Sequence, residues 1–329
     1  MNTRDKQRPK IVVLGGGTGT FTVLTGLKKY DVNLSAVVSI ADDGGSTGRL
    51  RDEMGVLPPG DIRQCLAALA EGDNALRHLL NFRFTKGELS GHNFGNLFIS
   101  ALEQMYGSAE SGIKMAHKIL RVAGRVIPVS ARASTLYAEL DDRSIVEGEH
   151  AIDMPGGDRA PILRCFLDPP VMANPDAVEA VRQADLLVMG PGDLHTSLVP
   201  VLLVEGVAEA LAAAGGKKVF VMNLVAKPGQ TQGYTAQSFL EKLDVYLRPA
   251  TLDAVVINTA PVPKPVLERY MQAGEHVIED DLGEPGNPRV AREDVLSDTI
   301  ARPKPGDMLK RSLLRHDPDK LARVLLDLA

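Results

Sequence analysis

A run of glycines and threonines near the start of the chain could hold an anionic ligand. The sequence GGGTGT, at Gly15–Thr20, directly follows the apolar run KIVVL and precedes a segment with helical spacing. Glycines allow a tight turn and leave backbone N–H groups accessible at the beginning of a helix. The residues concerned are Gly16, Gly17, Thr18 and Gly19. The spacing matches GxGxxG except that Thr20 replaces the third glycine. The alternative is a tight turn without a ligand.

A second stretch, ADDGGSTGRLRDE at residues 41–53, supplies carboxylates. Asp42 and Asp43 follow an apolar run, at the end of a predicted parallel strand. A carboxylate there can hydrogen-bond a ribose, hold Mg²⁺ beside phosphates or accept a proton. Asp, Gly and Ser are also ordinary turn residues, and the later charges read as a solvated, ion-paired face. For Asp42 we favour a ligand, because two such loops after adjacent strands would converge on one crevice.

The third stretch, MGPGDLHTSLVP at residues 189–200, is the best candidate for a phosphate cradle. Backbone N–H groups and hydroxyls at a helix N-terminus commonly bind phosphate. The residues concerned are Gly190, Pro191, Gly192, Asp193 and Thr196. Asn223 and Asn258 follow later apolar runs, where an amide could read a base or merely close a loop.

Two further loops allow a structural or a functional interpretation. In PPGDIRQCLAAL, Asp61 stands at a helix start, where an N-cap is at least as good an explanation as ligand contact. In SGHNFGNLF, His92 and Asn93 could read a base or sugar, or serve only the fold. The sequence alone does not choose between these roles.

Five apolar runs must position these loops. Each is apolar throughout rather than alternating, as in strands buried on both faces of a parallel sheet. The runs are Lys10 to Leu14, Leu34 to Ile40, Asp185 to Met189, Lys218 to Met222 and Ala254 to Asn258. They predict an α/β, Rossmann-like three-layer fold with a central, mostly parallel sheet.

The remaining segments read as additions to that sheet. Residues 61–124 have Leu and Ala at helical spacing and predict a cluster of helices, and 197–216 read as one buried helix. Residues 125–170, from RVIPVS onward, read as a small antiparallel insertion. The end, HDPDKLARVLLDLA, predicts a final docked helix. We expect one nucleotide-binding domain over residues 1–329.

Composition excludes several functional classes. The 329 residues carry a net charge of −5 and lack a long basic block, so nucleic acid is not expected as a partner. Cys65 and Cys165 stand far apart and read as reduced thiols. The charged start leads directly into a strand, and the longest apolar stretch is interrupted by Glu205 and Glu209. We therefore expect a cytoplasmic protein without membrane insertion.

In order along nearly the whole chain, these motifs resemble the YvcK/CofD-like family. The matching blocks are GGGTGT, ADDGGSTGRLRDE, PPGDIRQCLAAL, SGHNFGNL, GRVIPVS, TLYAEL, GPGDLHTS, NLVAKPGQTQGYT and RHDP. The sequence is most similar to the YvcK branch, also called GlmR or gluconeogenesis factor. That resemblance implies binding of UDP-N-acetylglucosamine and a role in gluconeogenic growth, cell-wall precursor supply and cell shape. The CofD branch implies instead a Mg²⁺-dependent phospholactate transferase that uses a guanylyl donor.

The resemblance also assigns site residues. It carries over to the first loop, Asp42, Asp43, His92, Asn93, the Gly190–Thr196 loop and Asn223, with Asp42 as the metal-binding acid of the CofD branch. It adds Tyr270 and Arg315 from the C-terminal region. Two departures are Tyr137, where His is usual, and Asp193, where Ser is usual and where a carboxylate would face the phosphate cradle.

Three functional hypotheses follow. The first is a nucleotide-sugar sensor, which needs no catalytic base or cofactor and biases a regulated metabolic enzyme. The second is a transferase in which Asp42 holds Mg²⁺ while a phosphoryl or nucleotidyl group moves. The third is an NAD-dependent dehydrogenase. The sequence leaves open whether the chain forms a homodimer.

Overall fold

A computed structural model describes residues 8–71, 74–283, 286, 288–299 and 313–329. Seven parallel strands form the central sheet, in the order β12-β10-β8-β7-β1-β2-β3. Their bounds are β1 Lys10–Gly15, β2 Asn33–Val38, β3 Arg125–Pro128, β7 Leu186–Met189, β8 Lys217–Val221, β10 Ala254–Asn258 and β12 Arg289–Glu293. The five predicted strands are confirmed within one or two residues.

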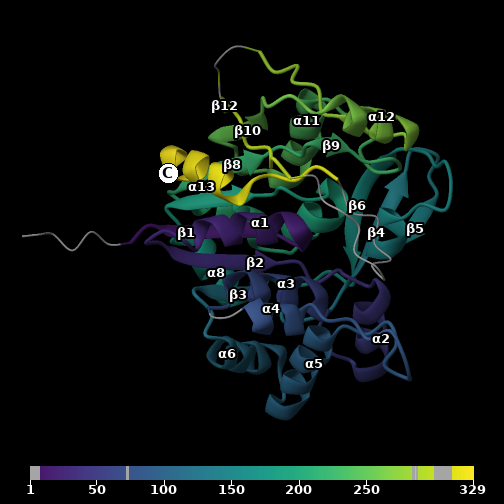
Figure 1. Ribbon diagram of the computed structural model, residues 1–329, viewed down its shortest axis with the longest axis vertical. Helices are drawn as coiled ribbons and strands as arrows, with labels where there is room; N and C mark the ends of the chain where they lie inside the picture. The colour runs from purple at the N-terminus through teal and green to yellow at the C-terminus, as the bar shows by residue number, and fades with distance from the viewer. Residues whose placement is uncertain (1–7, 72–73, 284–285, 287, 300–312) are drawn as a thin grey trace, which may run out of the picture.

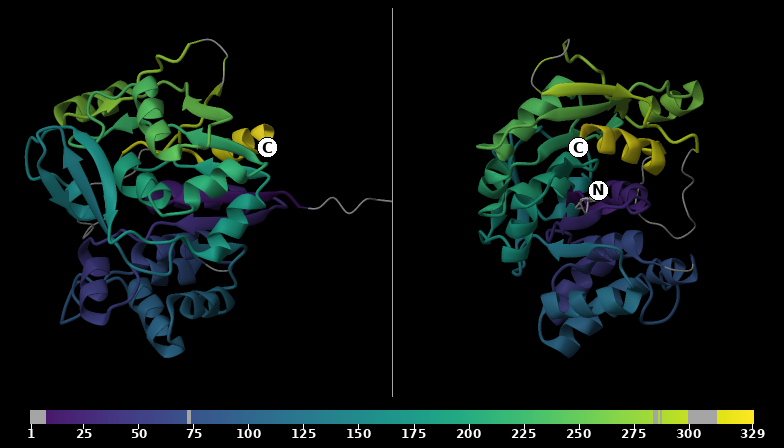
Figure 2. Two further views of the ribbon diagram at one scale, coloured as in Figure 1. Left: turned by 180° about the vertical axis from the view of Figure 1, so that it is seen from behind. Right: turned by 90° about the vertical axis from the view of Figure 1, so that its left-hand side faces the viewer.

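Helices cover both faces of this sheet, which gives the expected three layers (Figure 2). One face is covered by α1 Gly17–Leu27, α3 Pro59–Leu69, α5 Phe94–Tyr106, α6 Ala109–Leu120 and α13 Pro318–Leu328. The other is covered by α8 Pro175–Arg182, α9 Val199–Leu202, α10 Val207–Ala213 and α11 Ala236–Leu247. Alternate residues of β1 point to opposite cores, Ile11 to the first and Val12 to the second. Strands buried on both faces therefore need the continuous apolar runs that the sequence shows.

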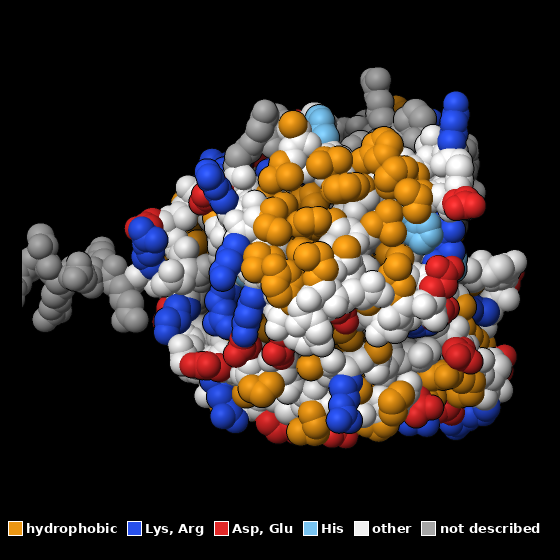
Figure 3. All heavy atoms as spheres, turned by 90° about the horizontal axis from the view of Figure 1, so that it is seen from below, with side chains coloured by type: hydrophobic (Ala, Val, Ile, Leu, Met, Phe, Trp, Pro, Cys, Tyr) orange, Lys and Arg blue, Asp and Glu red, His pale blue; other side chains and the backbone are white. Residues whose placement is uncertain are grey.

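The helical cluster forms one end of the molecule (Figure 1). It consists of α2 Gly45–Met54 and α4 Asn74–Leu80 together with α3, α5 and α6. The prediction of helices over 61–124 is confirmed. Seen from below, this end carries a broad area of apolar side chains (Figure 3).

The prediction of an antiparallel insertion over residues 125–170 is confirmed except at its start. A separate antiparallel sheet contains β4 Thr135–Leu140, β5 Ile145–Glu147 and β6 Ile162–Asp168. The short helix α7 Glu149–Asp153 connects β5 to β6. The segment at Arg125–Pro128, which we expected to be antiparallel, is instead the parallel edge strand β3 beside β2. Its four residues are too few to show whether the pattern alternates.

The stretch 197–216 is also not one helix. Its first two residues belong to a π-helical turn, η1 Leu194–Leu198, and the rest divides into α9 and α10 at Leu203–Gly206. Gly206 has φ +97°, a left-handed conformation that interrupts a right-handed helix. The smaller elements are β9 Val225–Ala226, β11 His276–Val277 and α12 Lys264–Gln272.

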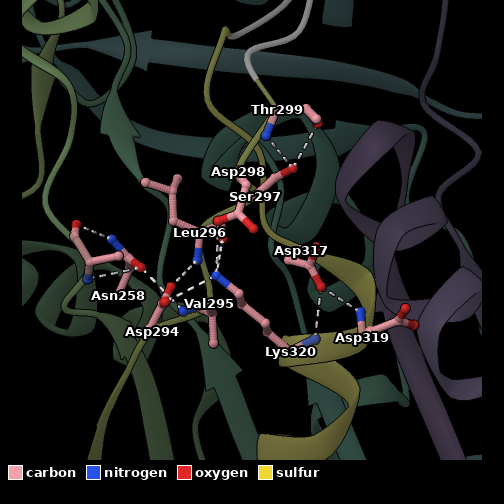
Figure 4. Close-up of polar contacts among 11 residues, drawn as sticks. Asn258, Asp294, Val295, Leu296, Ser297, Asp298, Thr299, Asp317, Asp319 and Lys320 are labelled. Atoms are coloured by element: carbon pink, nitrogen blue, oxygen red, sulfur yellow. Dashed lines mark hydrogen bonds and ion pairs between the residues drawn. The ribbon is translucent and has the colours of Figure 1, made fainter.

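The final helix is present as predicted, with Asp317 as its N-cap. Asp317 Oδ1 accepts from the N–H groups of Asp319 and Lys320 at 2.9 Å each (Figure 4). Lys320 Nζ in turn donates to Asp294 Oδ2 at 3.0 Å (Figure 4). Capping and this side-chain bond fix α13 beside the strand end of β12.

Candidate functional site

The loops that follow β1 and β7 meet at the carboxyl end of the sheet. β1 pairs in parallel with both β2 and β7, so that the chain winds away from β1 in two directions. A Cβ atom on Gly19 would lie 1.7 Å from the carbonyl oxygen of Pro191, which shows how closely the loops approach. This is the topological switch point, where open α/β sheets bind their ligands.

In the first loop, the glycines accommodate a carboxylate of the protein itself. Gly17 has φ +66°, and its N–H donates to Asp61 Oδ1 at 2.8 Å. A Cβ atom on Gly16 would lie 2.0 Å from Asp61 Oδ2. Asp61 lies in the first turn of α3, whose N-cap is Pro58, so the N-cap interpretation of Asp61 is wrong. Its carboxylate instead satisfies the N-terminus of α1.

The loop after β2 holds two aspartates with different partners. Asp42 Oδ1 accepts from Gly44 N–H at 3.0 Å, and a Cβ atom on Gly60 would lie 2.0 Å from Asp42 Oδ2. Asp43 Oδ1 accepts from His150 N–H at 2.7 Å. Asp42 therefore lies beside α3, whereas Asp43 ties α7 of the insertion to the main sheet.

Three carboxyl groups share this region and disfavour one another's charge. Burial and the neighbouring Asp42 raise the pKa of Asp61 to about 7. Burial, followed by Asp42 and Asp153, raises the pKa of Glu149 well above its ordinary value. Burial is also the main cause that raises the pKa of Asp42. The positive charge of Arg63 acts to lower the pKa of Asp42 and Asp61, but the effect of burial is larger.

A divalent cation suits this donor set. Carboxylate oxygens are the ligands that Mg²⁺ prefers, and it commonly uses one or two of them together with substrate phosphates. In the described part of the chain, no three His, Cys, Asp or Glu side chains are arranged to hold a metal by themselves. Asp42 and Asp61 are the side chains that would hold Mg²⁺ here, with phosphate oxygens completing its coordination.

An ion-pair cluster joins the loop after β7 to Lys227, which follows β9, and to Asp153 of α7. Lys227 Nζ donates to Asp193 Oδ2 at 2.9 Å and also pairs with Asp153 of α7. Burial alone would lower the pKa of Lys227, but the two carboxylates outweigh it and raise the pKa. The unusual carboxylate at Asp193 therefore has a cationic partner, which it shares with Asp153.

Buried polar atoms without a hydrogen-bond partner among the described residues lie in this loop and in the segments after β8 and β9. Asn223 Nδ2 donates to Gly192 O at 2.8 Å, which joins the loops after β8 and β7. Asn223 Oδ1, Thr196 Oγ1 and Gln230 Oε1 are buried and have no hydrogen-bond partner among the described residues. Such atoms are rare in folded proteins, because each costs about 1–3 kcal/mol. A bound polar ligand would satisfy them.

Helix α7 crosses this rim of the sheet and is held at both ends. Asp43 binds its first turn, and Lys227 binds Asp153 at its end. Arg159 adds bonds to Ile152 O and to Gly229 O. These contacts tie α7 to the loop after β2 and to the segment that contains Lys227 and Gly229.

The structure accounts for His92 and Asn93 by contacts within the protein. Asn93 is the N-cap of α5 and accepts from Asn96 N–H at 3.2 Å. His92 Nδ1 lies 3.3 Å from Ser46 Oγ, and burial lowers the pKa of this histidine. Both residues link α5 to α2, and their proposed contact with a ligand stays a prediction.

Of the two C-terminal candidates, Tyr270 lies in a separate small core and Arg315 follows Leu314 of that core. Tyr270 is buried with Leu224 and Leu296, and its hydroxyl accepts from Leu314 N–H at 2.8 Å. Arg315 O accepts from Ser297 N–H at 2.9 Å. Leu224 directly follows Asn223, so this core supports one side of the rim. A direct ligand contact of Tyr270 and Arg315 also stays a prediction.

Sequence reasoning missed three charged residues of the rim, Glu149, Asp153 and Lys227, and it did not foresee the contact of Asp61 with Gly17. Lys227 could have been found, because it follows Asn223 closely in a segment already considered. Glu149 and Asp153 belong to the insertion, and nothing in their local sequence indicates that α7 folds over the sheet.

Comparison with known proteins identifies relatives over nearly the whole chain. A family model described as "2-phospho-L-lactate transferase CofD" matches residues 11–296. A protein from Nostoc sp. is 42% identical over 97% of this chain and 68% of its own length. The gluconeogenesis factor of Bacillus subtilis is 36% identical over 98% of both chains.

A solved structure shares the fold. A crystal structure of a Bacillus halodurans protein superposes with a TM-score of 0.88 at 34% identity, over 97% of this chain and 99% of the other. Across the residues that the structure describes, every helix is too short or too polar to cross a membrane.

Proposed function

This chain belongs to the CofD family, and we propose that it binds a nucleotide sugar, UDP-N-acetylglucosamine, at the rim between the loops after β1 and β7. The observation that carries the proposal is the meeting of these loops at the switch point of the sheet, near buried polar atoms that lack partners within the described part of the chain. The relatives named gluconeogenesis factor support a regulatory role in carbon flow. We extend that role to cell-wall precursor supply and cell shape.

Each part of such a ligand has a suitable partner at this rim. Lys227 supplies the positive charge for the diphosphate, which would replace carboxylates that now pair with it. The amides of Asn223 and Gln230 suit hydroxyl and carbonyl groups of the sugar or base. Binding of this kind needs no reacting side chain, and separating α7 from the rim would give a partner protein a surface to read.

A second candidate function, a Mg²⁺-dependent transfer reaction, is favoured by the carboxyl groups of Asp42, Asp61 and Glu149 and by the family's description. Bound Mg²⁺ would neutralise charge that develops on a transferred phosphoryl group. In the protein itself, Asp42 and Asp61 would orient the phosphates, and α7 would exclude water from the rim.

Isothermal titration calorimetry tests the first function. We expect UDP-N-acetylglucosamine to bind with a micromolar dissociation constant, and Lys227→Met to weaken binding at least tenfold, because the diphosphate loses its cation. Lys217→Met, which changes an exposed lysine of β8, is the matched control. Absence of heat with any uridine nucleotide at millimolar concentration contradicts the proposal.

Incubation with nucleotide, Mg²⁺ and candidate acceptors tests the second. A transferase should form product that disappears in Asp42→Asn. Unchanged ligand with the wild-type protein, while calorimetry still shows binding, would leave the sensor function as the correct one.

A further inference from the structure

Two arginines lie against the turn at residues 90–92 without a carboxylate partner. Arg49 of α2 donates through Nη2 to Ser90 O at 3.2 Å, and Arg83 donates through Nη1 to Gly91 O at 2.7 Å. In the described part of the chain, neither guanidinium forms an ion pair. A guanidinium has five N–H donors, so most donors of both arginines remain available.

Backbone hydrogen bonds hold this turn in one conformation. His92 O accepts from Phe84 N–H at 2.9 Å, and Phe84 O accepts from Gly91 N–H at 2.8 Å. Gly91 has φ +84°, and a Cβ atom there would lie 2.9 Å from Arg49 Nη2. The guanidinium of Arg49 can therefore lie against the turn because Gly91 has no side chain.

His92, at the end of this turn, is buried but keeps one ring nitrogen at the surface. The residue is only 7% exposed, and its Nδ1 lies 3.3 Å from Ser46 Oγ. Nε2 has no hydrogen-bond partner among the described residues and is not one of their enclosed unpaired atoms, so it reaches solvent. Burial lowers the pKa of His92, and the nearby charges of Arg49 and Arg83 lower it further. Glu53 acts in the opposite direction.

Asn96 of α5 determines which hydrogen bond the hydroxyl of Ser46 can donate. Arg63 Nε, which can only donate, lies 2.9 Å from Asn96 Oδ1, and this contact fixes the orientation of the Asn96 amide. Asn96 Nδ2 therefore donates to Ser46 Oγ at 3.4 Å. Asn93 N–H donates to the same oxygen at 3.1 Å. Because both lone pairs of Ser46 Oγ are occupied, its proton is left for His92 Nδ1.

These hydrogen bonds determine where His92 carries its proton. A cationic ring, or a neutral ring protonated at Nδ1, would bring a third donor to an oxygen that has only two lone pairs. The neutral ring with its proton on Nε2 accepts the hydroxyl proton of Ser46 instead. His92 therefore presents an N–H donor to solvent, beside two arginines.

We propose that His92, Arg49 and Arg83 form a phosphate-binding site. All three side chains offer donors, and a phosphate group has three acceptor oxygens and a charge between one and two, which suits two guanidinium groups. The site contains no residue of the loops after β1 and β7. The proposal therefore goes beyond the nucleotide-sugar function and does not depend on it.

Long-range proton–nitrogen NMR spectra of the full chain, isotope-labelled at histidine and recorded at neutral pH, test this proposal. Such spectra distinguish the two neutral tautomers, and the signals of His92 are assigned by their loss in His92→Gln. We expect His92 to be protonated at Nε2 and its signals to move on addition of inorganic phosphate at millimolar concentration. Arg49→Gln and Arg83→Gln should each weaken phosphate binding at least tenfold, because the phosphate loses a charged donor.

Arg51→Gln is the matched control. Arg51 lies on the same helix as Arg49 but is ion-paired with Asp52 at 3.0 Å, so this variant should leave the phosphate affinity unchanged. Acetate in place of phosphate should bind at least tenfold more weakly, because a carboxylate has one charge and two oxygens. Thermal unfolding of the three arginine variants should match that of the wild type, which separates lost binding from misfolding.

Several results would overturn the proposal. They are a His92 ring that is cationic or protonated at Nδ1 in the wild type, His92 signals that phosphate does not move, equal phosphate affinity in all three arginine variants, and acetate binding as tight as that of phosphate. Because the signals of His92 report on this site alone, the result is the same whether or not a nucleotide sugar binds at the rim.

Discussion

The two glycine-rich loops of the rim look alike in sequence but serve the protein differently. The loop at Gly15–Thr20 is filled from within: Asp61 occupies the space beside Gly16 and takes the N–H of Gly17. The loop at Gly190–Thr196 leaves the oxygen of Thr196 without a partner among the described residues. Glycine content alone therefore does not identify the phosphate-binding loop. An unsatisfied polar atom inside such a loop, as at Thr196, is what distinguishes the second loop from the first.

The largest expected effect comes from filling the space between the two loops. Gly19→Ala would place a methyl group against the backbone of Pro191, and we expect it to lower the free energy of unfolding by about 3 kcal/mol. Gly215→Ala, at a glycine with open space around it, should change this free energy by less than about 0.5 kcal/mol. Urea denaturation of both variants measures the difference. Equal stabilities would show that the loops do not hold one another.

A smaller loss is expected when the cation of the second loop is removed. Lys227→Met leaves Asp153 and Asp193 together without their shared partner. Because these groups are partly exposed, we expect a loss of about 2 kcal/mol in the free energy of unfolding, below the value for fully buried pairs. Urea denaturation at pH 7 measures it. In the double variant with Asp193→Asn, part of the loss should return, and a strictly additive result would argue against direct coupling.

A third effect, on the pH dependence of stability, concerns the carboxylate in the first loop. Since the pKa of Asp61 is raised to about 7 from 3.8, its contribution to stability is full below pH 3.8 and is lost as the pH rises through 7. Asp61→Asn keeps an oxygen for Gly17 N–H but cannot ionise. Relative to the wild type, the variant should therefore gain about 1 kcal/mol or more between pH 5 and pH 8. Thermal or urea unfolding at the two pH values checks this, and a difference independent of pH would contradict the raised pKa.

The sequence was sufficient to predict those strands whose burial is visible in their own residues. Each of the five predicted strands is buried on both faces, and burial of that kind requires an uninterrupted apolar run such as Ala254–Asn258. The edge strands β3 and β12 were not predicted as members of the parallel sheet. β12 reads RVARE, in which exposed charged residues replace the apolar run because one edge and part of its face are open.

The candidate site could be predicted only in part, for a similar reason. Asp42 and the two glycine loops follow strands, so their meeting at one end follows from a parallel sheet. Glu149 and Asp153 reach the rim because the antiparallel insertion packs against it. The bond between His150 and Asp43 that holds α7 there joins segments 107 residues apart in the sequence. Local residue patterns contain no information about such a contact.

A titration of two threonine variants tests the central claim most directly. Thr196 and Thr25 both have a side-chain oxygen that is buried without a partner among the described residues, but Thr25 lies on α1 and away from the second loop. With UDP-N-acetylglucosamine in calorimetry, we expect Thr196→Val to weaken binding about tenfold, which corresponds to about 1.4 kcal/mol, and Thr25→Val to bind as the wild type does. Equal affinities for both variants and the wild type would contradict the assignment of the ligand to the loop after β7.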